Sequence, residues 1–201
     1  MGYFTHLKKD KQLREILKNQ TEVKLKKNGN LFIKLCGTIA GQQLSTKVAA
    51  TIYNRFLALY NKIPAPEEVL NTPDEKLRSV GLSAAKVSYI KNLAAFAIEH
   101  GINRRKLNKM NNDELIEYLT QIKGIGRWSV EMLMMFSMGR EDVFAIDDLG
   151  IQTSMASLYK LDRNDRKNFK EQMLKISGKW SPYRTYACIH LWNYKDNPPA
   201  L

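Results

Sequence analysis

Apolar residues recur every three or four positions along most of this chain, and this spacing constrains its fold more than any other feature. Two early segments illustrate it, one with Leu31, Leu35 and Ile39 and one with Val48, Ile52, Phe56 and Leu59. The period places apolar side chains on one face of an α-helix, whereas the two-residue alternation of a half-buried strand is nearly absent. The pattern predicts an all-α protein.

The chain is strongly basic, with 32 Lys and Arg residues against 20 Asp and Glu residues and a formal net charge of +12. Of its 201 residues, 44% are hydrophobic, which is enough to build an ordinary core in one or two small domains. A charge of this sign implies an anionic partner, either nucleic acid or an acidic membrane surface. The charge alone does not choose between them.

Cysteine usage and hydropathy favour an intracellular protein. Cys36 and Cys188 lie in apolar helical segments and are expected to be reduced core thiols. Two cysteines are too few for a four-cysteine iron–sulfur cluster. No apolar run approaches the roughly 20 residues of a membrane span, and the basic N-terminus is not followed by the apolar segment of a secretory signal. We expect no membrane contact, and a location in the cytoplasm (nucleoid) of a bacterium or archaeon or in a eukaryotic nucleus.

Residues 113–138 have the pattern of two amphipathic helices joined by a short glycine hairpin. The helices carry apolar faces formed by Leu115, Ile116 and Leu119 and by Val130, Leu133, Met134 and Phe136. Gly124 and Gly126 let the backbone turn tightly and approach another surface. The N–H groups that open the second helix would form an anion site suited to a DNA phosphate. The alternative is that one glycine only ends a helix and the other only starts the next.

Two carboxylates, Asp147 and Asp148, follow the hairpin, and this order of features resembles the helix–hairpin–helix DNA glycosylase superfamily. The superfamily signature is the hairpin, a basic residue, one discriminating residue and a later aspartate. Arg127, Trp128 and Asp148 occupy these places, with Asp148 lying 20 positions after Trp128. Three further blocks resemble the alkylpurine branch, the 3-methyladenine DNA glycosylase II type: residues 40–45, 81–86 and 180–192. The resemblance covers about residues 30–195.

The resemblance implies a two-lobed helical fold that hydrolyses an N-glycosidic bond in DNA. Superfamily members that also cut the DNA strand have a lysine nucleophile where this chain has Trp128. A tryptophan cannot form a Schiff base. The resemblance therefore implies a monofunctional glycosylase that leaves an abasic site. Trp128 is then expected to form a wall of the base pocket, with a core aromatic as its alternative role.

Asp148, rather than Asp147, is the acid to which the family spacing assigns catalysis. Cleavage of the bond passes through an oxocarbenium-like sugar, and a carboxylate beside that sugar stabilises the positive charge and orients or activates the attacking water. Residues 149–159 have a helical pattern that Asp148 would cap, which favours a charged carboxylate. A purely structural N-cap is the alternative role.

The base pocket is expected to be aromatic and apolar. By resemblance its lining includes Trp128, Trp192 and Met132, the last at a position where some relatives have an aromatic residue. No second acid–base residue is evident, because we expect Glu131 on a solvated helix face and His190 as a hydrogen-bonded core histidine. A purine alkylated at N3 or N7 is already positively charged, so a pocket that attracts cations suffices. The expected partner is double-stranded DNA containing 3-methyladenine or 7-methylguanine.

Several residues are expected to contact DNA. The lesion must leave the base stack, and by resemblance a turn enters the minor groove in its place, with Gln43 as the plug and Gln42, Leu44 and Ser45 beside it. A polar helix start is the alternative. Phosphate contacts are expected from Lys86, Lys123, Arg127 and the hairpin glycines Gly124 and Gly126. The affinity for DNA should then fall steeply with salt.

In members of the superfamily that this chain resembles, backbone carbonyls of the hairpin also bind a monovalent cation next to the DNA phosphate. The matching backbone carbonyls belong to Thr120, Ile122 and Ile125. Side-chain identity matters little there, because the ligands are backbone oxygens. We expect a structural Na⁺ or K⁺ at this place and no required cofactor.

Three segments are expected within one compact glycosylase domain. Residues 1–30 form a helical segment that packs on the C-terminal lobe, residues 31–110 form a lobe with the minor-groove turn, and residues 111–201 form the hairpin and catalytic lobe. The first segment has Leu13, Ile16 and Leu17 on one face. We expect a monomer. Two alternatives stay open, a glycosylase of the same fold for an oxidised or deaminated base and a catalytically silent DNA-binding module.

Overall fold

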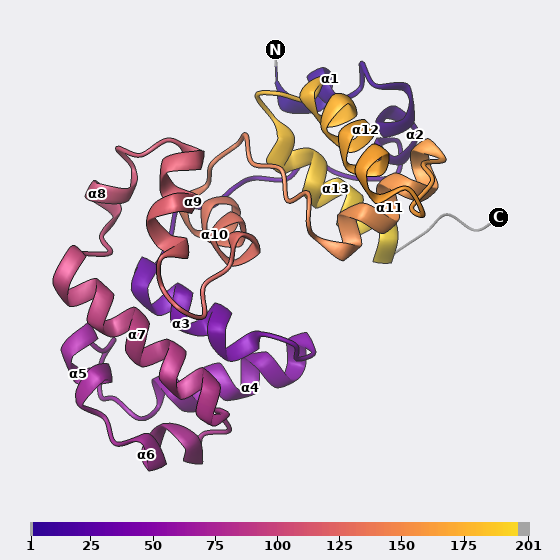
Figure 1. The fold of residues 1–201 in the computed structure, drawn as a ribbon. Coiled ribbons are helices and arrows are strands. Elements are labelled where there is room, and N and C mark those ends of the chain that lie inside the picture. The colour runs from indigo at the N-terminus through magenta and orange to yellow at the C-terminus, as the bar shows by residue number, and fades with distance from the viewer. Residues whose placement is uncertain (1, 197–201) are drawn as a thin grey trace. The chain divides into compact units, whose positions relative to one another are not determined.

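The computed structural model describes residues 2–196, and the regular elements among them are all helices (Figure 1). This confirms the all-α prediction. In chain order they are α1 (Tyr3–Leu7), α2 (Lys11–Leu17), α3 (Leu31–Gly41), α4 (Thr46–Leu57), α5 (Pro66–Asn71), α6 (Asp74–Ser79), α7 (Ala84–His100), α8 (Arg104–Leu107), α9 (Asn112–Thr120), α10 (Arg127–Leu133), the π-helical turn η1 (Met134–Met138), α11 (Leu149–Tyr159), α12 (Arg166–Gly178) and α13 (Arg184–Asp196).

Two compact units make up the chain. In the described part, residues up to 26 join those from 139 onward in what we call the terminal unit, and residues 27–138 form the middle unit. Residues 111–138, which the sequence predicts to belong to the C-terminal lobe, group with the middle unit in the structure. The physical reason is that α10 packs on α3 as well as on α9.

Helices α3 and α7 form the centre of the middle unit. α3 packs on α4, α7 and α10, and α7 also packs on α5 and α6 (Figure 1). The predicted apolar faces are buried, since Leu35, Ile39 and Phe56 have no exposed surface. Val48 is an exception, with 44% of its surface exposed. The core therefore supports α10, and with it one side of the hairpin.

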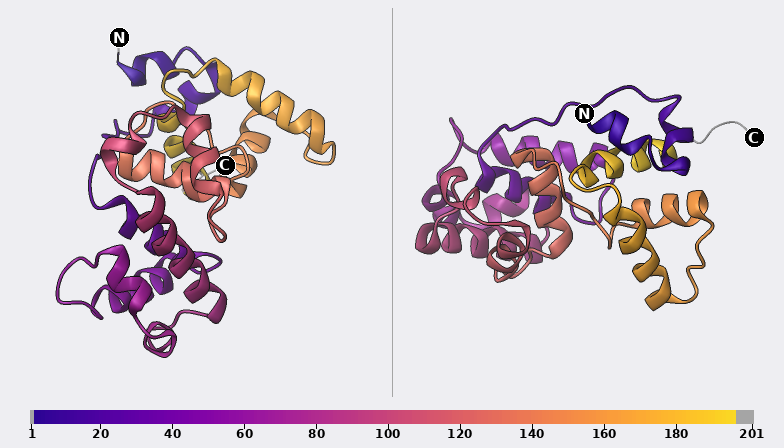
Figure 2. Two further views of the ribbon diagram at one scale, coloured as in Figure 1. Left: turned by 60° about the vertical axis from the view of Figure 1, so that its left-hand side comes forward. Right: turned by 90° about the horizontal axis from the view of Figure 1, so that it is seen from above.

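Helix α13 is the centre of the terminal unit, where it packs on α11 and α2. The predicted face of the N-terminal segment is buried, with Leu13, Ile16 and Leu17 each at most 8% exposed. The ring of Tyr3 also stacks on Tyr186 of α13, with 3.8 Å between centroids. α12 follows α11 after a connection at residues 160–165 (Figure 2). The N-terminal helix thus completes a core built mainly by the C-terminal helices.

His190 is a hydrogen-bonded core histidine, as predicted. Its side chain is fully buried on α13, and its Nδ1–H donates to Gln20 Oε1 at 2.6 Å. Gln20 Nε2 in turn donates to the backbone carbonyl of His190 at 3.1 Å. Burial lowers the pKa of His190 to about 4. The ring is therefore neutral at neutral pH and serves to attach the N-terminal segment.

Both cysteines are free thiols in the core, as predicted. Burial raises the pKa of the Cys36 thiol, which makes it a poor nucleophile. Over residues 2–196, no helix has the length and apolar character needed to cross a membrane.

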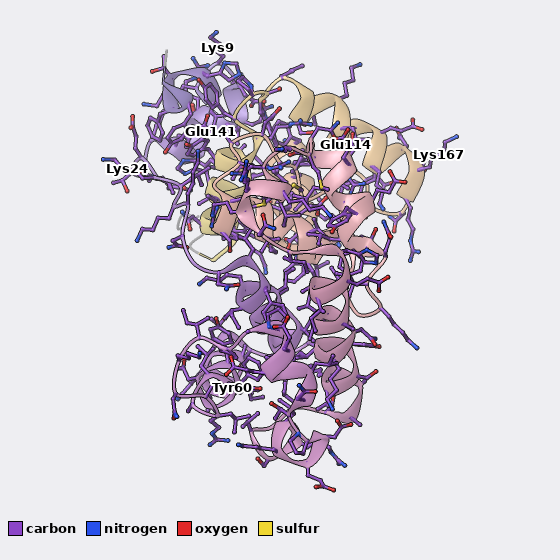
Figure 3. All side chains as sticks on the ribbon, turned by 90° about the vertical axis from the view of Figure 1, so that its left-hand side faces the viewer. Lys9, Lys24, Tyr60, Glu114, Glu141 and Lys167 are labelled. Carbon is purple, nitrogen blue, oxygen red and sulfur yellow. The ribbon has the colours of Figure 1, made fainter. Side chains whose placement is uncertain are left out.

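Basic side chains are spread over the surface. Figure 3 shows Lys9, Lys24 and Lys167 projecting outward from the ribbon, and all three are exposed. The lysine-rich stretch at residues 24–29 lies outside the helices. Such dispersed charges attract an anionic partner in general without defining where it binds.

Candidate active site and nucleic-acid interface

The predicted helix–hairpin–helix is present in the middle unit, where residues 121–126 connect α9 to α10. Gly124 has φ +103°, and a Cβ there would lie 2.2 Å from the Tyr89 ring, so both conformation and packing require glycine. Gly126 has φ −97°, and a Cβ there would meet nothing within 4 Å. Lys123 is exposed beside them. The space at Gly126 lets another molecule approach the first N–H groups of α10, as a phosphate site requires.

Glu131 is buried, so the prediction that it lies on a solvated helix face is wrong. Its exposed fraction is 1%, and Arg127 Nε donates to Glu131 Oε1 at 2.9 Å, one helical turn away. α10 packs on both α9 and α3, and the Glu131 side chain lies in the covered part of the helix surface. The pair holds the Arg127 side chain, 49% of which is exposed, at the start of α10.

Two predicted pocket residues, Trp128 and Met132, also lie on α10, one turn apart. Trp128 is 41% exposed, which is a large aromatic surface for a folded protein to leave in solvent. Met132 lines a cavity of about 390 Å³ within the middle unit, together with Tyr53 of α4 and Phe136 of η1. Cavities of this size accept small ligands. Tyr53 was not predictable as a neighbour of Met132 from the sequence, because α4 is distant from α10 along the chain.

In the α3–α4 turn, residues 42–45, three residues are exposed, and two of the four also form hydrogen bonds that hold the turn. Gln43 is exposed with φ +58°, a left-handed conformation that costs about 1–2 kcal/mol for a residue with a side chain. Leu44 is 38% exposed. Ser45 caps α4, and Gln42 Nε2 donates to the carbonyl of the first hairpin glycine at 2.9 Å. Gln43 and Leu44 are therefore exposed without a capping role, whereas Ser45 is exposed and also caps α4.

Lys86, a predicted phosphate contact, bonds to the protein's own backbone in the structure. Its Nζ donates to the carbonyl oxygens of Ala40 and Gln42, each at 2.8 Å. These carbonyls lie at the C-terminal end of α3, where intrahelical donors are lacking and the helix dipole favours a cation. Burial lowers the pKa of Lys86. The sequence did not reveal this because the carbonyls belong to a helix about 45 residues earlier.

Backbone carbonyls at the end of α9 have the chemistry expected for a monovalent cation site. Thr120 is the last residue of α9, so its carbonyl lies at the negative end of the helix dipole without an intrahelical donor. The Ile122 carbonyl accepts the Ile125 N–H at 2.9 Å and keeps a second lone pair. Carbonyl oxygens of this kind can replace the hydration shell of K⁺. Within residues 2–196, no cluster of three or more His, Cys, Asp or Glu side chains could hold a metal ion.

Asp148 is the N-cap of α11, as predicted. Its Oδ1 accepts the Ile151 N–H at 2.9 Å and the Trp192 indole N–H at 2.8 Å. Both donors and the positive end of the helix dipole stabilise a negatively charged carboxylate. Trp192, which the sequence predicts as a pocket wall, is thus a direct hydrogen-bond partner of the predicted catalytic acid. Both belong to the terminal unit, whereas Trp128 and Met132 belong to the middle unit.

Asp147 has a different neighbour. Its Oδ1 accepts from Lys170 Nζ of α12 at 2.5 Å, and the two side chains are 45% and 49% exposed. Such exposed ion pairs contribute little to stability. The two adjacent acids are therefore distinguished by their surroundings, since Asp148 is bonded to a helix N-terminus and an indole while Asp147 is paired with a surface lysine.

Gly150 is a further residue of this region that the sequence analysis did not identify. A Cβ there would lie 2.9 Å from Trp192 Cδ1 and 3.0 Å from Asp148 Oδ1. A side chain would push the indole away from the carboxylate, so glycine is needed for their hydrogen bond. The signal in the sequence is a glycine in the first turn of a predicted helix, where this residue type is disfavoured.

Comparison with known families identifies the region in which these features lie. The profile of the family described as HhH-GPD superfamily base excision DNA repair protein matches residues 36–179. The matched region begins in α3 and ends after α12. It therefore includes the α3–α4 turn, the hairpin and Asp148, but not Trp192.

Individual relatives extend the match over most of the chain. DNA-3-methyladenine glycosylase 1 of Schizosaccharomyces pombe is 40% identical over 164 residues, which cover 80% of this chain and 71% of that protein. DNA-3-methyladenine glycosylase of Saccharomyces cerevisiae is 32% identical over 226 aligned positions, which cover 92% and 76%. In each case the alignment covers more than two thirds of the relative's own length.

Solved structures agree with the fold. The S. pombe 3-methyladenine DNA glycosylase Mag1, in complex with abasic DNA, superposes with a TM-score of 0.86 at 33% identity, covering 99% of this chain and 98% of that one. A DNA-3-methyladenine glycosidase from Bacillus halodurans gives a TM-score of 0.83 at 34% identity, covering 96% and 88%. The similarity therefore extends to α13 and to Trp192, beyond the region matched by the family profile.

Proposed function

This chain belongs to the HhH-GPD superfamily of base excision DNA repair proteins, and on that premise we propose that it is a monofunctional DNA glycosylase for alkylated purines in duplex DNA. Water adds to C1′ of the nucleotide while the damaged base leaves, which hydrolyses the N-glycosidic bond. The product is an abasic site, and base excision repair begins from it. Relatives 40% and 32% identical are named DNA-3-methyladenine glycosylases, which supports the substrate class.

The environment of Asp148 is the observation that carries this proposal. Two donors on Oδ1 hold the carboxylate in one orientation at the start of α11. A negative charge held in advance stabilises the developing oxocarbenium ion without reorganising during the reaction. The same carboxylate orients or deprotonates the attacking water. Asp147 forms an exposed ion pair with Lys170 and does not take part in the proposed reaction.

Release of the base without strand cleavage is proposed from Trp128. An indole cannot attack C1′ to form a Schiff base, so the lyase reaction has no nucleophile at this position. The 41% exposure of Trp128 leaves its ring available to contact a ligand. Its role is therefore to contact the extruded base rather than to bond with the sugar.

Alkylated purines are proposed because the residues found here favour a leaving group that needs no proton. Glu131 and His190, the two candidates for a second acid–base group, are buried and bonded to Arg127 and to Gln20. A purine carrying a positive charge leaves unaided, and an indole face attracts such a cation. Trp128, Met132 and Trp192 are the proposed pocket residues.

Binding to DNA is proposed to use the hairpin and the α3–α4 turn. The N–H groups at Gly126 and the exposed Lys123 contact a phosphate, and the net charge of +12 attracts the duplex from a distance. Gln43, with Leu44 beside it, fills the space that the extruded nucleotide leaves. Extrusion costs a few kcal/mol and is least costly for a damaged base.

Hydrolysis by this mechanism needs no cofactor. A Na⁺ or K⁺ held by the carbonyls of Thr120, Ile122 and Ile125 would neutralise part of the charge of the bound phosphate. We propose that the protein acts as a monomer wherever the DNA is kept, in the nucleoid or in the nucleus.

The test is to incubate the wild-type protein and Asp148→Asn with duplexes that each contain one lesion. The lesions are 3-methyladenine, 7-methylguanine, 1,N6-ethenoadenine, hypoxanthine and 8-oxoguanine, and alkali then reveals abasic sites. We expect release of an alkylated purine by the wild type only. Release of 8-oxoguanine alone would overturn the substrate class, strand breaks without alkali would overturn the monofunctional mechanism, and no release at all would favour a DNA-binding module.

A further inference from the structure

One helix of the middle unit supports both segments that are proposed to contact DNA. Lys86, Tyr89 and Asn92 follow one another at three-residue intervals along α7. Lys86 bonds the end of α3 and the turn after it. Tyr89 packs against Gly124 so closely that no Cβ fits between them, and Asn92 Nδ2 lies 3.5 Å from the carbonyl oxygen of Lys123. The turn and the hairpin therefore share a support that is distant from each of them in sequence.

A direct link also joins the two segments. Gln42 Nε2 donates to the Gly124 carbonyl at 2.9 Å, across 82 residues of sequence. The backbone carbonyl of the same glutamine accepts from Lys86 Nζ at 2.8 Å. Gln42 is thus bonded through its side chain to the hairpin and through its backbone to α7. A displacement of the turn would have to break one of these bonds.

The bond from Lys86 acts on the peptide group that determines the conformation of Gln43. The Gln42 carbonyl belongs to the peptide plane immediately before Gln43, and Gln43 has φ +58°. A left-handed residue other than glycine persists only when its surroundings hold it there. The second Lys86 bond, to the Ala40 carbonyl, fixes the last turn of α3 from which this peptide emerges. Lys86 therefore holds the backbone from which the exposed Gln43 side chain projects.

We propose that Lys86 is a positioning residue for extrusion of the damaged base. It keeps the α3–α4 turn in its inserting conformation and, with Gln42, at a constant distance from the phosphate-binding hairpin. Insertion of Gln43 is then coupled to binding of the DNA phosphate by the hairpin, because the α3–α4 turn and the hairpin move as one body. This inference rests on the proposed function, but its main readout is insertion into DNA and does not require base release.

The experiment compares Lys86→Met with a matched control, Lys91→Met. Lys91 lies on the same helix and forms a surface ion pair with Asp74, away from the turn and the hairpin. The probe is a duplex with a stable abasic-site analogue and 2-aminopurine as its neighbour, whose fluorescence changes when a side chain enters the stack. We expect Lys86→Met to lose most of this change while its affinity stays within about threefold of wild type, with the salt dependence unaltered. Lys91→Met should match wild type.

Catalysis provides a second comparison. Release of an alkylated purine from a fully paired duplex should fall at least about tenfold in Lys86→Met, because misplaced groups far from the chemistry slow a reaction strongly. Release from the same lesion in an unpaired bulge, which needs little extrusion, should fall much less. Equal losses on both substrates would overturn the proposal. Absence of base release by the wild type, with normal insertion at the abasic analogue, would refute the proposed function and leave this inference intact.

Two results would assign Lys86 differently. If the slope of log K against log salt decreases by about one with the insertion signal intact, Lys86 is a phosphate contact and the proposal fails. If Lys86→Met melts at a much lower temperature, Gln42→Leu provides the independent test, because it breaks the link to Gly124 and leaves both Lys86 bonds. We expect Gln42→Leu to lose insertion as well. Full insertion by this variant would contradict the coupling.

Discussion

Trp192 and Asp148 are joined by a hydrogen bond of 2.8 Å from the indole Nε1–H to the carboxylate Oδ1, across 44 residues of sequence. The bond brings together a residue of α13 and the residue that precedes α11, within the terminal unit. It gives Trp192 a role beyond stacking on a base, because the indole determines where the carboxylate points. Gly150 leaves the space in which the bond forms.

We expect Trp192→Phe to slow base release by about 10- to 100-fold with little change in the affinity for DNA. A hydrogen bond to a charged group contributes about 1.5–3 kcal/mol, and each 1.36 kcal/mol of barrier is tenfold in rate. Phenylalanine keeps an aromatic face, so stacking is largely retained. Single-turnover kinetics and fluorescence anisotropy measure the two quantities. A parallel loss of rate and affinity would mean that Trp192 acts through binding alone.

Substitution of the two adjacent acids should have very different effects. Asp148→Asn is expected to abolish base release and to keep DNA affinity and melting temperature, since asparagine caps a helix as well as aspartate does. Asp147→Asn removes only an exposed ion pair with Lys170 and should change the rate by less than about threefold. Both variants are assayed on the same duplex and by thermal melting. Turnover by Asp148→Asn would refute its assignment.

Alanine is expected to affect stability at one hairpin glycine and DNA binding at the other. Gly124→Ala should lower the free energy of unfolding by at least about 1–2 kcal/mol, because φ is positive and the new methyl group meets the Tyr89 ring. Gly126→Ala should leave stability unchanged within about 0.5 kcal/mol, since nothing lies near its Cβ. Its effect should appear as weaker binding to DNA. Urea denaturation and anisotropy separate the two, and normal DNA binding by Gly126→Ala would place the phosphate elsewhere.

Stability should decrease in acid because of His190. Burial lowers its pKa to about 4 in the folded protein, whereas the unfolded chain has the ordinary value of about 6.5. Between these values the unfolded state binds more protons, so the free energy of unfolding falls as the pH drops from about 6.5 to about 4, by about 2–3 kcal/mol at most. Above pH 7 this contribution is fully present.

The measurement for His190 is urea denaturation at several pH values for wild type and His190→Gln. The difference between the two curves should shrink as the pH falls through this window, because glutamine does not titrate. His100→Gln, at an exposed histidine, is the control and should parallel the wild type. A difference in the free energy of unfolding between wild type and His190→Gln that stays constant with pH would show that the buried ring does not cause the loss of stability in acid.

Features that depend on neighbours along the chain were predictable from the sequence. The helix–hairpin–helix followed from helical spacing on either side of Gly124 and Gly126, and the N-cap role of Asp148 followed from the apolar pattern just after it. Helix periodicity and capping act over a few residues, so a linear pattern contains them. The burial of His190 was predictable for the same reason, since it lies within an apolar run.

Features that depend on contacts between distant segments were not predictable from the sequence. Glu131 looks like a solvated residue on one helix, but it is buried in the folded protein and bonded to Arg127. Lys86 looks like any surface lysine until α7 lies beside the end of α3.

The all-α fold, the hairpin and the acid at the start of α11 are thus predictable from the amino-acid pattern, because backbone hydrogen bonding within helices and caps is local. The contacts that hold those parts in place depend on how the helices pack. Helix packing places Trp192 beside Asp148 and Lys170 beside Asp147. It also places Lys86 where it donates to the α3–α4 turn. The physical reason is that a side chain's partner depends on which helices pack together, and helix packing brings together residues whose separation in sequence has no fixed value.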